Sequence, residues 1–239
     1  MQEETEPIPL ICLPFAGSGA SFYRAWAKLD AGTPIIALQL SGHEERFLEP
    51  LATDVIVAAK EFATEVARIG VGRHPVALFG HSLGAVLAFE TAREVLRTDP
   101  GMVRHLFVSG SPGPWTRRTR RATGVEDPEF VARIIEFAGY RHRAFDDPDL
   151  REVLLPLLRA DVAMHEDYRP VCDEPLGIAL TALRGVSDQL VSRSQAEQWR
   201  AATTGPFAVA ELPGGHMYLA ERPGDLLEVI SRCLRDETR

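Results

Sequence analysis

Gly80-His81-Ser82-Leu83-Gly84 lies between a short apolar run, residues 76–79, and an amphipathic run, residues 85–96. This order predicts a strand, a sharp turn and a helix, with Ser82 at the apex of the turn. Glycine is needed at positions 80 and 84, because side chains there would collide with the neighbouring strand and helix. The serine oxygen is then exposed at a helix N-terminus, where free N–H groups and the helix dipole favour the negative charge that forms when a serine attacks a carbonyl.

The composition of the chain fits one α/β domain with a well-buried core. Its 239 residues are too few for two independent domains of this kind. A formal net charge of -8 argues against a nucleic-acid partner, because such binding needs a positive face. Three widely separated cysteines without a CxxC pair are typical of a reducing cytosol. The acidic first residues do not resemble a signal peptide and no run is long enough for a membrane span, so we expect a cytoplasmic protein without a membrane partner.

Six short apolar runs predict strands that are buried on both faces. They are residues 9–15, 34–40, 76–79, 103–109, 178–183 and 207–212. Helical patterns separate most of them, at residues 20–29, 54–69, 85–96, 195–202 and 224–234, with Thr53, Ser194 and Arg222-Pro223 as the expected helix starts. This alternation predicts an α/β fold with a doubly wound, mostly parallel sheet.

Residues 112–170 break the alternation, because no strand pattern appears there and helices are expected at residues 127–137 and 147–165. We interpret this region as a helical lid insertion within a single domain, residues 1–239. An insertion at the carboxyl edge of a parallel sheet covers the place where active sites of this architecture lie. Phe130, Ile134, Leu154 and Leu158 are candidates to line the site, although packing within the insertion explains them equally well. The alternative is a helical decoration with no role in substrate binding.

A serine nucleophile needs a histidine as base and an acid to hold that histidine. His216 is the best-placed base, because Gly214-Gly215 lets the loop after the last predicted strand return over Ser82. Asp188 follows the preceding strand and gives the order Ser, Asp, His. Asp161, Asp167 and Asp173 remain as alternative acids. The other histidines are expected to be ordinary core or surface residues: His43, His74, His81, His105, His142 and His165.

The oxyanion of such a reaction needs two hydrogen-bond donors. One donor is the Leu83 N–H, directly after the nucleophile. The other is expected from the loop at residues 14–19, where the Ala16 N–H is the first candidate and the Phe15 N–H is the alternative. That loop also carries Gly17 and Gly19, which suggests a phosphate cradle. The third glycine of a dinucleotide fingerprint and the Gly-Lys-Ser/Thr of a P-loop are both missing. No histidine pair has metal-ligand spacing, so neither a cofactor nor a metal is implied.

With these residues the chain resembles the type II thioesterases of polyketide and nonribosomal peptide assembly lines, which are free-standing α/β-hydrolase proteins. The resemblance runs over nearly the whole chain. It is carried by Leu13-Pro14-Phe15-Ala16-Gly17 with Phe22-Tyr23 and Trp26, by the turn at residues 80–84 with Phe89-Glu90, by Asp188, and by Gly214-Gly215-His216 before Tyr218-Leu219. One departure is visible after the second predicted strand: the family usually has Pro-Gly-Arg, and this chain has Ser41-Gly42-His43 followed by Glu44-Glu45-Arg46.

The resemblance implies hydrolysis of acyl groups from the phosphopantetheine thiol of an acyl or peptidyl carrier protein, through an acyl-Ser82 intermediate. The residues alone indicate only a serine hydrolase that acts on an ester or thioester. Two alternatives remain: a small-molecule carboxylesterase with the same triad, and a binding protein that kept the fold without the chemistry.

A basic cluster stands at the start of the insertion of this otherwise acidic chain: Arg117, Arg118, Arg120 and Arg121. Carrier proteins are generally acidic and present a phosphate at the base of the thiol arm. A basic rim at the mouth of the site would steer and hold them. The alternative interpretation is a solvated loop whose charges have no specific partner.

Overall fold

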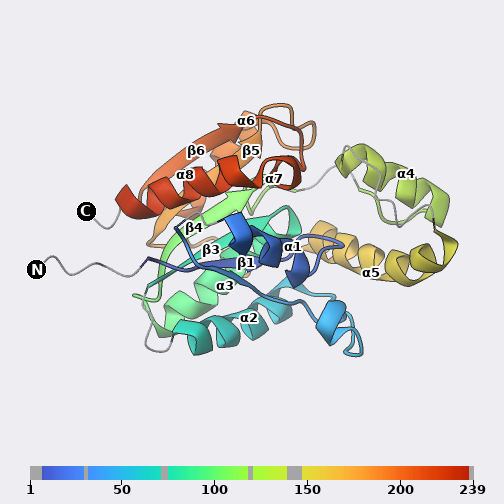
Figure 1. Cartoon of the computed structure of the whole chain (residues 1–239), viewed down its shortest axis with the longest axis horizontal. Coiled ribbons are helices and arrows are strands. Elements are labelled where there is room, and N and C mark those ends of the chain that lie inside the picture. The colour runs from blue at the N-terminus through green and yellow to red at the C-terminus, as the bar shows by residue number, and fades with distance from the viewer. Residues whose placement is uncertain (1–6, 30–31, 71–74, 118–120, 139–146, 237–239) are drawn as a thin grey trace, which may run out of the picture.

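The computed structural model describes residues 7–29, 32–70, 75–117, 121–138 and 147–236 (Figure 1). Six parallel strands form one sheet in the order β2-β1-β3-β4-β5-β6 within this part of the chain. The strands are β1 (Leu10–Leu13), β2 (Ile35–Ala37), β3 (Val76–His81), β4 (Val103–Ser109), β5 (Ala179–Gly185) and β6 (Phe207–Leu212). All six predicted strands are therefore confirmed, and so is the parallel sheet.

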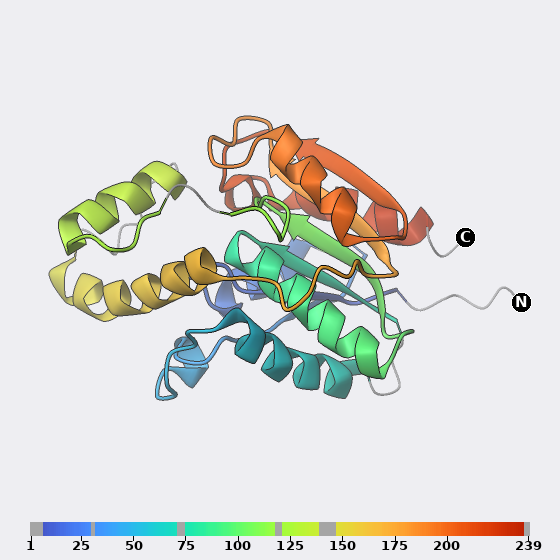
Figure 2. The same cartoon turned by 180° about the vertical axis from the view of Figure 1, so that it is seen from behind.

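Helices cover both faces of the sheet, as Figures 1 and 2 show from opposite sides. One face carries α2 (Val55–Gly70), α3 (Leu83–Thr98), α6 (Arg193–Glu197) and the 3-10 helix η4 (Gln198–Ala202). The other carries α1 (Ala20–Arg24), the 3-10 helix η1 (Ala25–Leu29), α7 (Tyr218–Glu221) and α8 (Pro223–Asp236). A further 3-10 helix, η2 (Glu44–Arg46), follows β2. The doubly wound arrangement is confirmed.

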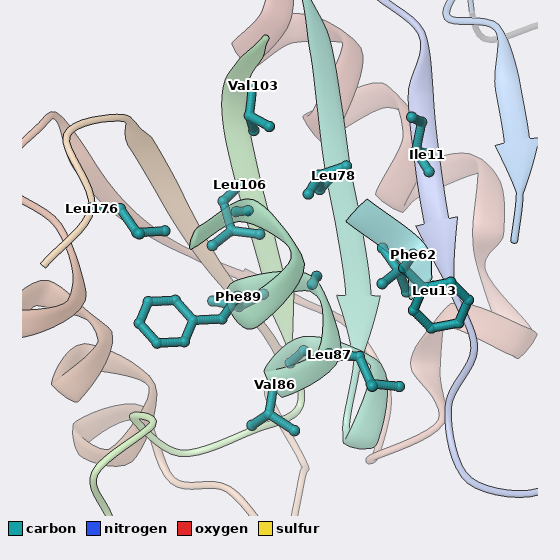
Figure 3. Packing of buried hydrophobic residues seen from close by; sticks show 14 of the residues in the cluster. Ile11, Leu13, Phe62, Leu78, Val86, Leu87, Phe89, Val103, Leu106 and Leu176 are labelled. Atoms are coloured by element: carbon teal, nitrogen blue, oxygen red, sulfur yellow. The ribbon is translucent and has the colours of Figure 1, made fainter. Parts of the chain in front are cut away.

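Alternate side chains of the central strands supply the two cores. Leu78 of β3 and Leu106 of β4 pack toward α3, together with Phe62 and Phe89 (Figure 3). Their neighbours in sequence, such as Phe79 of β3, pack on the opposite face. Strands buried on both faces in this way are largely shielded from water, which explains why their sequences are nearly continuous apolar runs rather than alternating ones.

The carboxyl ends of the strands lie side by side. Leu13 pairs with Gly80 across β1 and β3, and Ser109 pairs with both His81 and Leu183. At the edge, Gly185 pairs with Leu212. The loops that leave these strands therefore start from one edge of the sheet, where parallel α/β proteins place their sites.

The region between β4 and β5 extends away from the sheet (Figures 1 and 2). It contains α4 (Asp127–Ala138) and α5 (Pro148–Asp167), which confirms the two expected helices. A small core of its own joins them, with Phe130, Leu155, Leu158 and Val162 buried and Ile134 packed against it. Measured by length and apolar content, the helices within the described residues fall short of what a bilayer crossing requires.

Candidate active site

The turn between β3 and α3 holds Ser82 in a strained backbone conformation. Its φ is 53° and its ψ is -112°, which few residues other than glycine adopt. A side chain at position 80 would overlap the backbone of Gly84, and one at position 84 would come within 2.7 Å of the Leu13 oxygen. The strand and the helix can therefore approach each other only because both positions are glycine, as the sequence predicts. The strain is typical of a site where geometry matters more than stability.

Asp188 and His216 are joined by a hydrogen bond of 2.9 Å between Oδ2 and Nδ1. The second oxygen of Asp188 accepts hydrogen bonds from the backbone N–H groups of Leu190 and Val191, at 2.8 and 3.1 Å. Burial alone raises the pKa of Asp188, but the bond from His216, its charge and these two N–H groups outweigh burial and hold the pKa below its ordinary value. The charged carboxylate fixes the proton of His216 on Nδ1, which leaves Nε2 as the basic nitrogen.

The loops that carry this pair are interlocked. The Ser187 N–H donates to the Gly214 oxygen at 2.9 Å, and the Val186 N–H donates to the Leu212 oxygen at 2.8 Å. Gly185 has no room for a Cβ, because the Gly214 oxygen would lie 2.5 Å from it. Gly185 is not among the site residues predicted from the sequence, although a glycine at the end of a strand is the available signal.

The rings of His81 and His216 lie together next to the Ser82 turn, with their centroids 4.7 Å apart. The His81 ring is buried, and its Nδ1 is 2.9 Å from the Ser109 hydroxyl, which is 2.7 Å from the Tyr218 hydroxyl. Burial, followed by the nearby His216, lowers the pKa of His81 well below its ordinary value, so the ring is neutral.

The loop after β1, residues 14–19, lies next to the Ser82 turn, because Leu13 at the end of β1 pairs with Gly80 of β3. We call it the oxyanion loop. Three of its N–H groups are already bonded: Phe15 to the Ser18 hydroxyl at 2.8 Å, Ser18 to the Phe15 oxygen at 2.9 Å, and Gly17 to Asp161 at 2.7 Å. The Ala16 N–H makes no hydrogen bond to any residue that the structure describes. This favours Ala16 over Phe15 as the donor from this loop, beside the Leu83 N–H at the start of α3.

The alternative acids and bases lie elsewhere. Asp161 is bonded to His43 at 2.9 Å, a pair that was not predicted from the sequence, and Asp167 is paired with Arg121 at 2.7 Å. Asp173 is exposed. His105 is bonded to the Thr181 hydroxyl at 2.9 Å within the sheet, and His165 is buried in α5. His74 and His142 lie outside the described residues.

The basic cluster is described only in part. Arg117 is exposed, and Arg121 pairs with Glu166 at 3.2 Å as well as with Asp167. Arg118 and Arg120 lie outside the described residues. As for metals, no group of three or more His, Cys, Asp or Glu side chains within the described ranges is arranged to hold one.

Comparisons with known proteins agree on one family. The family described as "Thioesterase domain" matches residues 8–234. The probable cadicidin biosynthesis thioesterase of Streptomyces griseus is 34% identical over 98% of this chain, which spans 64% of that relative's length. Thioesterase PikA5 of Streptomyces venezuelae is 32% identical, with 94% of this chain and 80% of the relative covered. Among solved structures, the type II thioesterase BorB from the borrelidin biosynthetic cluster is 34% identical, with a TM-score of 0.81 and coverage of 95% and 93%.

Proposed function

The chain belongs to the thioesterase family, and from this premise we propose that it hydrolyses acyl groups from the phosphopantetheine thiol of acyl or peptidyl carrier proteins. One relative is described as a probable cadicidin biosynthesis thioesterase, and BorB is described as a type II thioesterase from the borrelidin biosynthetic cluster. The observation that carries the proposal is the hydrogen-bonded pair of Asp188 and His216 beside the strained Ser82 turn. We place the protein in the cytoplasm, in line with its three free cysteines.

In the proposed reaction, the Ser82 hydroxyl attacks the thioester carbonyl and His216 Nε2 takes the hydroxyl proton. Asp188 stabilises the resulting imidazolium, because it is buried, charged and bonded to Nδ1. The N–H groups of Ala16 and Leu83 hold the oxyanion of the tetrahedral intermediate. Collapse of this intermediate expels the pantetheine thiolate, which is a better leaving group than an alkoxide, and the imidazolium gives its proton to that thiolate, so His216 is neutral again. Water activated by His216 then releases the acid from acyl-Ser82.

We propose further that residues 112–170 act as a lid within the single domain. Support comes from the contact between α5 and the oxyanion loop: a Cβ on Gly17 would lie 2.9 Å from the Leu158 side chain, and Ala16 packs against the core of the insertion. The insertion therefore touches the loop whose N–H group receives the oxyanion. A lid in this position controls which acyl groups reach Ser82.

The experiment is to replace Ser82 by Ala and to measure hydrolysis of a propionyl carrier protein and of the matched oxygen ester of a small alcohol. We expect wild type to favour the carrier thioester, and Ser82→Ala to lose about 10⁶-fold in kcat. The matched control is Ser194→Ala, an exposed serine on α6 that should keep wild-type rates. Wild-type activity in Ser82→Ala would overturn the proposed nucleophile, and equal rates on both substrates would favour a carboxylesterase.

A further inference from the structure

A buried pair of charged side chains lies directly behind the oxyanion loop. His43 follows β2 and Asp161 belongs to α5, and their side chains are only 3% and 1% exposed. The His43 Nε2 is 2.9 Å from Asp161 Oδ2, and the Gly17 N–H donates to the same oxygen at 2.7 Å. One carboxylate oxygen thus joins the β2 loop, the insertion and the residue after Ala16.

The hydrogen bonds of His43 determine its protonation state. Nδ1 lies 3.1 Å from the Ser41 carbonyl oxygen, while Nε2 faces the carboxylate. Both partners accept hydrogen bonds, so each ring nitrogen has to carry a proton and the ring is an imidazolium. The Gly17 N–H also points at Oδ2, so this oxygen acts as the acceptor for both partners and the proton of the pair stays on His43. A buried charge pair of this kind is costly to break from either side.

The surroundings of His43 favour the charged ring. Burial alone lowers the pKa of His43, but the hydrogen bond and charge of Asp161, the Ser41 carbonyl and the charge of Glu44 outweigh it and raise the pKa above its ordinary 6.5. The other titratable or charged groups close to the pair in sequence are Glu45 and Arg46 beside His43, and Arg159 and His165 on α5. Since the folded value is raised, the pair contributes fully below pH 6.5, and its contribution is lost as the pH rises through the raised value.

Backbone geometry explains how the chain places His43 there. Gly42 has a φ of 80°, and a Cβ on it would come within 3.0 Å of the Leu51 backbone. The loop turns sharply at this glycine, and the Gly42 N–H is closed onto the Arg46 oxygen at 3.1 Å. The imidazole is thereby directed at α5. This glycine belongs to Ser41-Gly42-His43, the stretch in which the sequence departs from the pattern of the family that it resembles.

We propose that the protonated His43 and Asp161 form a positioning pair that holds the oxyanion loop in its catalytic shape and makes that shape depend on pH. The inference rests on the proposed function, because it concerns the donor from Ala16. When His43 loses a proton, the neutral ring keeps only one N–H, so it can no longer donate to both Asp161 and the Ser41 carbonyl, and the buried carboxylate loses its cation. Asp161 Oδ1 already has no hydrogen-bond partner among the described residues, so nothing there replaces the lost charge. The Gly17 N–H contact then weakens and Ala16 moves out of place.

The test is the pH profile of kcat, from pH 5.5 to 9.5, for hydrolysis of propionyl-N-acetylcysteamine by the full chain. We expect wild type to lose activity at alkaline pH. His43→Gln lacks the charge and should show a kcat about 10- to 100-fold lower at neutral pH, without that alkaline decline. His43→Arg keeps a charge at every pH, and should restore kcat and remove the decline. His105→Gln, which alters a buried histidine away from the loop, is the matched control and should keep the wild-type profile.

A second measurement on wild type does not depend on how the variants fold. Side-chain ¹⁵N NMR should find both ring nitrogens of His43 protonated at pH 7. Amide exchange at Gly17 should accelerate as that proton is lost. A neutral His43 ring at pH 6.5, or a wild-type pH profile in His43→Gln, overturns the inference.

The two proposals fail in different ways. If wild type hydrolyses the thioester and Ser82→Ala does not, while His43→Gln is unchanged, the positioning pair is wrong and the function stands. If wild type does not hydrolyse the thioester, the proposed function is wrong, and the NMR titration still decides whether His43 and Gly17 are coupled.

Discussion

At the scale of single residues, Asp188 shows how one carboxylate can serve two purposes. It accepts a hydrogen bond from His216 on one oxygen and two backbone N–H groups on the other. Asp188→Asn would turn an NH₂ group toward one of these donors and favour the wrong tautomer of His216. We expect kcat to fall by roughly 10⁴-fold, measured on a small acyl thioester, with the melting temperature recorded alongside.

Two other carboxylates serve as comparisons for that variant. Asp173→Asn changes an exposed side chain and should be mild. Asp161→Asn should fall in between, because it weakens the loop without touching His216. A loss in either of them as large as that in Asp188→Asn would show that the acid has been assigned to the wrong residue.

Gly185 gives a prediction about packing, because the His216 loop leaves no space for a side chain at this position. Gly185→Ala would push a methyl group against the Gly214 oxygen, which belongs to rigid backbone, and displace the His216 loop. We expect a loss of about 1–3 kcal/mol in the free energy of unfolding, together with reduced kcat. Gly177→Ala is the matched control, since a Cβ there meets nothing within 4 Å. Equal stability of the two variants contradicts the argument.

At the scale of elements, the sequence predicts the strands better than the ends of the helices. Thr53 and Ser194 were expected at helix starts, but Asp54 accepts from the Ile56 and Val57 N–H groups. Ser192 forms the capping box with Gln195. Apolar runs identify buried strands because burial requires them, whereas several polar residues near a helix start compete for the same N–H groups.

The same distinction applies to the candidate site. Ser82, Asp188 and His216 follow individual strands, so their meeting at one edge follows from a parallel sheet. The pairing of His43 with Asp161 spans 118 residues and depends on how α5 docks, which periodicity does not encode. The one feature of the sequence that points to this pair is His43 itself, because it departs from the pattern of the family at that position.

The insertion makes a further prediction at this scale. Phe130 is fully buried inside its core, so packing explains that residue. Ile134 and Leu154 are only half-buried and are better placed to line an acyl pocket. We expect Ile134→Ala and Leu154→Ala to shift the preference for acyl chain length, measured as kcat/KM over short, long and branched acyl carrier proteins.

The control for this series is Val153→Ala, whose side chain is 71% exposed on α5. It should leave the preference unchanged. If every variant has the wild-type preference, the insertion does not select the acyl group.

At the scale of the whole molecule, the basic cluster stands out against a net charge of -8. The charge of Arg121 is already shared with Glu166 and Asp167, so a test of carrier docking should leave it in place. Arg117→Glu combined with Arg118→Glu should raise KM for an acyl carrier protein and weaken its salt dependence, with little change for the N-acetylcysteamine thioester.

The matched control for that pair reverses two exposed arginines elsewhere, Arg68 on α2 and Arg232 on α8. It changes the net charge by the same amount. Docking by the cluster is refuted if both double variants raise KM equally, or if neither does.

The order of the proposed site residues along the chain has a consequence for protein synthesis. The nucleophile loop follows β3, whereas the acid and the base follow β5 and β6. A ribosome-bound chain therefore exposes Ser82 long before it has made His216. Because chains fold from the N-terminus as they are made, the first half can build β1, β3 and β4 while it still lacks its base. If Ser82 and His216 act as proposed, nascent chains cannot hydrolyse thioesters until translation has passed His216.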